Sequence, residues 1–150
     1  MLLTNIVYLI IVYLLHFSWL ILTFMPQLLY VALGGALGAI GRYLVAGWVQ
    51  EFSGSFFPWG TVVVNTLGSF LLGFVIQAGI SGGLGSEQRL LLAVGFLGAF
   101  TTFSTFAYEA FELYRLGQTW QTLGYIGINL FGGLILVALG IASFNVLRGM

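Results

Sequence analysis

The chain alternates long apolar stretches with short polar segments. Four stretches predict membrane helices over residues 27–50, 58–80, 89–114 and 120–144, because about 20 apolar residues cross the hydrocarbon of a bilayer. A further apolar stretch, residues 1–24, precedes them, and Met25 follows it directly. We interpret it as an extra hydrophobic helix or as the product of a mis-assigned translation start. The predicted fold is an all-α membrane protein in which residues 25–150 form a four-helix unit.

The third predicted helix turns polar at what is expected to be membrane depth. Gly95 and Gly98 lower its helix propensity and leave backbone carbonyls open to approach, so we predict a break there. Hydroxyl and carboxylate groups in hydrocarbon need partners, and they commonly mark a permeation path. The polar residues that follow the two glycines are Thr101, Thr102, Ser104, Thr105 and Glu109.

Two phenylalanines are interleaved with these hydroxyl residues. Phe103 and Phe106 are three positions apart, which places both rings on one face of the helix that resumes after the break. The rings either pack against neighbouring helices or contribute to a path, and their spacing does not decide between these roles.

Polar residues also occur inside the other predicted helices. Thr61, Asn65 and Ser69 follow one another at four-residue steps, so they share a helix face that either joins helices or lines a pore. In the first core helix, Gly34 and Gly38 form a GxxxG pair that permits close helix packing. Arg42, in the same helix, either snorkels to the interface or acts as a structural anchor.

Composition narrows the class of protein. Hydrophobic residues make up 60% of the chain and charged residues 5%, whereas soluble domains carry about 25% charged residues. The sequence has no Cys, Lys or Asp, and its only histidine is His16, which argues against zinc sites, thiol catalysis and a Ser-His-Asp triad. We therefore expect a protein that is not an enzyme. Four Arg balance four Glu, so no basic patch indicates nucleic acid as a partner.

The loop charges give a weak orientation signal. Arg89 and Arg148 are expected on one side of the membrane and Arg115 on the other, a difference of only one positive charge. This near balance predicts that the chain inserts in both orientations. Four helices with small and polar residues are too few to enclose a pore comfortably, so we also expect an oligomer.

Three segments carry a pattern that is specific in order, spacing and residue type. They are Gly34-Gly35-Ala36-Leu37-Gly38-Ala39 with Arg42-Tyr43, then Pro58-Trp59-Gly60-Thr61 with Val64-Asn65 and Gly68-Ser69-Phe70, then Gly95-x-x-Gly98 with Thr101-Thr102-Phe103-Ser104-Thr105-Phe106 and Glu109. Over residues 27–145 the chain resembles the Fluc (CrcB) fluoride channels. Residues 1–24 have no counterpart in that pattern.

The resemblance implies a dual-topology homodimer of antiparallel four-helix subunits in the lipid of the cell inner membrane. Such a dimer would export fluoride passively through two narrow pores, with a structural sodium ion at its centre. The backbone carbonyls of Gly98 and Thr101 would hold that ion. The family's fourth helix often has another hydroxyl where Gly133 stands here. The implied fluoride path consists of Asn65, Phe103, Phe106, Thr105, Glu109, Tyr125 and Asn129.

Two other classes of function are consistent with a small four-helix membrane protein. A small multidrug-type, proton-coupled transporter requires a membrane-embedded carboxylate in its first core helix, but residues 27–50 contain no Glu or Asp. The only intramembrane carboxylate candidate is Glu109, late in the third core helix. An accessory subunit without transport activity would not require the alternating Thr and Phe residues.

Overall fold

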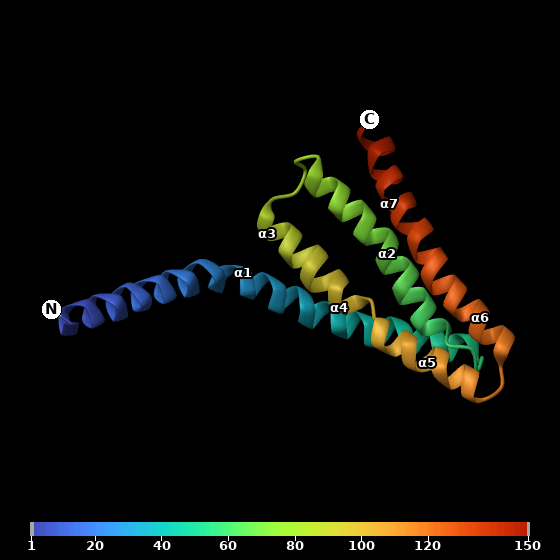
Figure 1. Ribbon diagram of the computed structural model, residues 1–150. Coiled ribbons are helices and arrows are strands. Elements are labelled where there is room, and N and C mark those ends of the chain that lie inside the picture. Colours follow the sequence, from blue (N-terminus) through green and yellow to red (C-terminus); the bar gives the residue numbers. More distant parts are fainter. Residues whose placement is uncertain (1, 150) are drawn as a thin grey trace.

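The computed structural model describes the backbone of residues 2–149 and the side chains of residues 10–14, 16–18, 21 and 24–149. Its first element, α1, runs from Leu2 to Ser53 with Pro26 inside the helix. Figure 1 shows that the N-terminal part of α1 projects away from all other helices. Residues 2–24 and the first core helix are thus one continuous element. Their assignment as an extension outside the core stays a prediction.

Four helical segments among the described residues are long and apolar enough to cross a membrane: Phe24–Ser53, Trp59–Ile80, Ser86–Arg115 and Thr119–Arg148. They confirm the four core helices predicted from the hydrophobic pattern. The protein is a multi-pass membrane protein. The observed spans extend beyond the predicted limits by several residues at some ends, because helix ends are the least specific part of a hydrophobic pattern.

The second span is a single helix and the fourth is composite. Helix α2 runs from Trp59 to Ile80 with Pro58 as its N-cap, where the missing proline N–H leaves no hydrogen bond unmade. The fourth span consists of α6 (Thr119–Gly127), the π-helical segment η2 (Ile128–Gly132) and α7 (Gly133–Arg148). In Figure 1, α2 lies alongside α7 over most of its length.

The third span is interrupted, as its glycines and hydroxyl residues predict. It comprises α3 (Ser86–Arg89), the π-helical segment η1 (Leu90–Leu97), α4 (Gly98–Phe100) and α5 (Phe103–Arg115). Thr101 and Thr102 separate α4 from α5 in extended conformation, with ψ of 159° and 117°. Figure 1 shows the chain leaving the helix between α4 and α5. The predicted break is confirmed and lies at these two residues.

Close packing of α1 on η1 depends on the GxxxG pair. A Cβ atom built on Gly34 would collide with the Leu91 carbonyl oxygen, and one on Gly38 would collide with the Phe96 carbonyl oxygen. Only glycine allows the two backbones to approach so closely. This contact confirms the predicted role of the pair, and it fixes the first part of the third span before the break.

Candidate functional site

One side chain of α2 pairs with the backbone of the break. Asn65 Oδ1 accepts a hydrogen bond from the Thr102 N–H at 2.8 Å, and Asn65 Nδ2 donates to the Thr102 carbonyl oxygen at 3.1 Å. Asn65 Nδ2 also donates to Asn129 Oδ1 at 2.9 Å. Thr102 is buried, so these bonds satisfy backbone groups that water cannot reach. Asn65 thus joins α2, the break and the fourth span.

The break removes helical donors from two carbonyl groups. In a continuous α-helix the Thr102 N–H would donate to the Gly98 carbonyl, but here it donates to Asn65. The Thr105 N–H would likewise donate to the Thr101 carbonyl, but it donates to Thr102 Oγ1 at 3.3 Å. Gly98 and Thr101 therefore each have a carbonyl oxygen without its i+4 donor.

Hydroxyl groups hold the first turn of α5. Thr102 is the N-cap of this helix, and its hydroxyl also donates to Thr105 Oγ1 at 2.9 Å. An N-cap hydroxyl satisfies one of the free N–H groups at a helix start, which stabilises the helix by about 1 kcal/mol. The two threonines therefore fix where α5 begins and how its phenylalanines are oriented.

A cavity of about 200 Å³ lies beside the break. Phe103 and Phe106 both line it, with ring centroids 5.6 Å apart. The two rings differ in exposure: Phe103 is 75% exposed in the single chain, whereas Phe106 is only 7% exposed. Among the described residues, no charged side chain lines this cavity. Its lining residues are Asn65, Ser69, Leu72, Thr101, Thr102, Phe103, Phe106, Asn129 and Leu130.

Tyr125 connects this cavity to Glu109. The tyrosine is fully buried, its ring lies 5.5 Å from that of Phe106, and its hydroxyl donates to Glu109 Oε2 at 2.6 Å. The Tyr125 carbonyl accepts a hydrogen bond from Asn129 Nδ2 at 3.0 Å. A chain of hydrogen bonds therefore runs from Asn65 through Asn129 and Tyr125 to Glu109, and the Phe106 ring packs against Tyr125 beside it.

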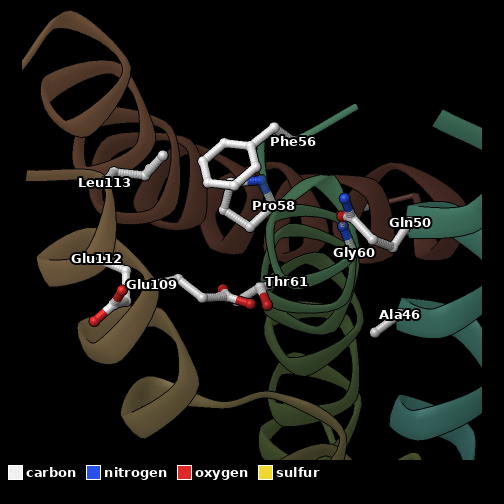
Figure 2. Close-up of a pocket in the computed structure, with 9 residues that line it drawn as sticks. All are labelled: Ala46, Gln50, Phe56, Pro58, Gly60, Thr61, Glu109, Glu112 and Leu113. Carbon is white, nitrogen blue, oxygen red and sulfur yellow. Dashed lines mark hydrogen bonds between the residues drawn. The ribbon is translucent and has the colours of Figure 1, made fainter. Parts of the chain in front are cut away.

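Glu109 faces a second cavity of about 260 Å³, drawn in Figure 2. The figure shows the Glu109 carboxylate of α5 beside Thr61 of α2. Gln50 lies on the far side of this cavity, where its Oε1 accepts a hydrogen bond from the Gly60 N–H at 3.3 Å. The lining residues are Ala46, Gln50, Phe56, Pro58, Gly60, Thr61, Glu109, Glu112 and Leu113.

Arg42 lies at a third cavity, of about 310 Å³. Its Nε atom is buried and has no hydrogen-bond partner among the described residues. The cavity shares Thr61 with the one in Figure 2 and Thr102 with the one at the break. The lining residues are Ala39, Arg42, Tyr43, Ala46, Gly47, Thr61, Val64, Thr102 and Thr105.

The structure brings the seven predicted path residues together only in part. The cavity at the break is lined by four of them: Asn65, Phe103, Phe106 and Asn129. Thr105 lines the cavity of Arg42, and Glu109 lines the cavity in Figure 2. Tyr125 is fully buried and lines none of the three. The sequence pointed to Thr102 as one of the polar residues after the glycines, but it did not predict that the Thr102 backbone is the main partner of Asn65. A backbone contact carries no residue-type signal, so the sequence does not mark this pairing.

The comparisons with known proteins agree with the motifs. A family model described as CrcB-like protein, Camphor Resistance (CrcB), matches residues 29–141. The chain belongs to the CrcB family. The match covers the second and third spans and most of the first and fourth, and it leaves residues 1–28 and 142–150 outside. The resemblance indicated by the three motif segments is confirmed.

Several relatives of this chain carry the name Fluoride-specific ion channel FluC. One from Hahella chejuensis is 51% identical over 118 residues, which are 78% of this chain and 93% of that protein. One from Thermus thermophilus is 50% identical over 112 residues, covering 75% of this chain and 88% of the relative. One from Methanococcus maripaludis is 46% identical over 116 residues, covering 77% and 93%.

Proposed function

We propose that this CrcB-family chain is the subunit of a fluoride-selective channel through which fluoride leaves the cytoplasm passively. The observation that carries the proposal is the uncharged cavity at the break, lined by the amides of Asn65 and Asn129 and the rings of Phe103 and Phe106. Its similarity to proteins named fluoride-specific ion channels supports the choice of ion. The relatives' names and the family match do not point to a multidrug-type transporter.

The cavity suits a small, strongly hydrated anion. Amide N–H and hydroxyl O–H groups can replace the water around fluoride, and the positive edges of phenyl rings attract an anion weakly. A fixed arginine at the same place would bind fluoride tightly and slow its release, whereas conduction needs weak binding. Arg42 stays outside this cavity, in keeping with a role as structural anchor.

In this arrangement the Asn129 side-chain amide has an N–H without a partner among the described residues, whereas the Asn65 amide has none to spare. Both hydrogens of Asn65 Nδ2 are engaged, by the Thr102 carbonyl and by Asn129 Oδ1. Asn129 Nδ2 donates one hydrogen to the Tyr125 carbonyl, which leaves the second available. We infer that fluoride meets Asn129 first, and that Asn65 becomes a donor to the anion when fluoride displaces the Asn129 oxygen.

The test is fluoride efflux from liposomes that contain the purified chain, measured with a fluoride electrode and compared with chloride efflux. We expect rapid fluoride efflux and no chloride efflux above that of protein-free vesicles. Equal rates for both anions, or no fluoride efflux from vesicles that hold folded protein, would contradict the proposal.

The carbonyl groups at the break are suitable ligands for a sodium ion. The described residues contain no cluster of three or more His, Cys, Asp or Glu side chains that could hold a metal. The carbonyl oxygens of Gly98 and Thr101, each without its helical donor, are neutral hard ligands of the kind that such a cation accepts. Bound sodium would supply a positive charge that holds the two ends of the break together.

We further propose that the chain pairs head to tail in the cell inner membrane. Arg148 approaches the Gly82–Gly83 turn, so the loop after α2 and the C-terminus lie at one end of the unit. A single Cys at Ser86 and another at Thr119, at opposite ends, should each be labelled partly from each side, since the native chain has no Cys. Labelling of either position from one side only would contradict dual topology and the central sodium site.

A chain that starts at Met25 is expected to insert, dimerise and move fluoride at the full-length rate. Figure 1 shows the N-terminal part of α1 away from the four-helix unit, and the family match begins at residue 29. The measurement is fluoride efflux from matched liposomes at equal protein content. Loss of efflux from the shortened chain would show that residues 1–24 belong to the working channel.

A further inference from the structure

Ser69 carries a hydroxyl that makes no hydrogen bond with the other residues that the structure describes. It lies on α2 one turn after Asn65, is half-buried, and lines the cavity at the break. Hydroxyl groups inside helices commonly donate to the carbonyl four residues earlier. Thr66, Thr101 and Thr122 do so here, at 2.6, 3.0 and 2.9 Å. Among the contacts of the described residues, the Ser69 hydroxyl has no hydrogen bond.

Gly133 at the start of α7 keeps this hydroxyl uncovered. A Cβ atom built on Gly133 would lie 3.4 Å from Ser69 Oγ, at ordinary contact distance. Any larger side chain there would compete with Ser69 for the same space. The absence of a side chain at position 133 therefore leaves the Ser69 hydroxyl facing the cavity that Asn129 and Phe103 also line.

We propose that Ser69 donates a hydrogen bond to the anion in this cavity and is a further path residue of the channel. A half-buried hydroxyl without a partner loses hydrogen bonds to water, and an anion that enters the cavity restores one. The anion then meets two donors: the Ser69 hydroxyl from α2 and the second N–H of the Asn129 amide from the fourth span. This inference rests on the proposed fluoride conduction, and it adds a donor that the path predicted from the sequence did not include.

The test compares four variants with the wild type in fluoride-loaded liposomes, after size-exclusion chromatography has shown that each is folded and dimeric. Ser69→Ala is expected to slow fluoride efflux by about 10- to 150-fold, as for the loss of one hydrogen bond to a charged group. Ser69→Thr keeps the hydroxyl and should retain most of the rate. Thr66→Ala, which loses a hydroxyl already bonded to the Val62 carbonyl, is the matched control and should transport at the wild-type rate.

The double variant Ser69→Ala/Gly133→Ser separates donation from packing. It returns a hydroxyl to the same space from α7, so efflux should recover although residue 69 is still alanine. Wild-type efflux in Ser69→Ala, or equal slowing in Ser69→Ala and the double variant, would overturn the role of Ser69 while leaving the channel function intact. If wild-type vesicles release no fluoride at all, the proposed function is wrong and this inference falls with it.

Discussion

Replacing Asn65 with alanine is expected to slow fluoride efflux by about 10- to 100-fold, which corresponds to roughly 1.4–2.7 kcal/mol of activation free energy. The reason is that one side chain satisfies both backbone groups of the buried Thr102 and also bonds Asn129. Each buried polar group left unpaired costs about 1–3 kcal/mol. The extended segment between α4 and α5 would therefore rearrange, and the cavity beside it would lose its shape.

Gln77→Ala is the matched control for this variant. Gln77 lies on the same helix, and its amide contact resembles that of Asn65 with Asn129, because Gln77 Nε2 donates to Asn145 Oδ1 at 2.9 Å. It lines none of the three cavities described above. Its loss removes one hydrogen bond between α2 and α7 but should leave efflux unchanged. Equal slowing by both variants would mean that Asn65 serves only to hold helices together.

The four spans and the break could be predicted because each follows from residue type alone. Apolar length sets the spans, and the GxxxG pair indicates the close contact of α1 with η1. Glycines followed by hydroxyl residues place the break within a few residues of Thr101. For Thr61, Asn65 and Ser69, the sequence left helix contact and pore lining open. Asn65 does both, since it bonds two neighbouring segments and lines the cavity.

The contacts that position the site could not be predicted, because they involve backbone groups or space. Asn65 pairs with the amide and carbonyl of Thr102, which every residue except proline offers. The π-helical segments η1 and η2 depend on hydrogen-bond register rather than on any residue pattern. Ser69 gains its importance from the side chain that Gly133 lacks. A glycine in a membrane helix usually indicates close packing of helices, not an uncovered hydroxyl.

The two phenylalanines of the cavity test the path in different ways. Phe106→Ile and Phe103→Ile are each expected to slow fluoride efflux by about 10-fold or more, or roughly 1.4 kcal/mol, because each removes a ring edge that attracts the anion. Isoleucine fills most of the volume of phenylalanine, so each change should cost less stability than the roughly 3–5 kcal/mol of a Phe→Ala truncation. Both variants should therefore remain folded and dimeric by size-exclusion chromatography.

Each variant has a control phenylalanine of similar exposure that lies outside the cavity. Phe100 is 4% exposed and stacks on Phe96, so Phe100→Ile reproduces the packing loss of Phe106→Ile. Phe131 is 67% exposed, close to the 75% of Phe103, and Phe131→Ile reproduces the surface change. Neither Phe100 nor Phe131 lines the cavity at the break. Both controls should transport at the wild-type rate.

Phe103 gives the more decisive result of the two. A ring that is 75% exposed in the single chain contributes little packing there, so a role in packing one subunit predicts no effect of Phe103→Ile on efflux. An anion contact predicts slowing at both positions, because both rings line the cavity at the break. The contrary result is that Phe106→Ile and Phe100→Ile slow efflux equally while Phe103→Ile leaves the rate unchanged. The Phe106 ring would then serve to pack the helices together, and the anion contacts would lie elsewhere.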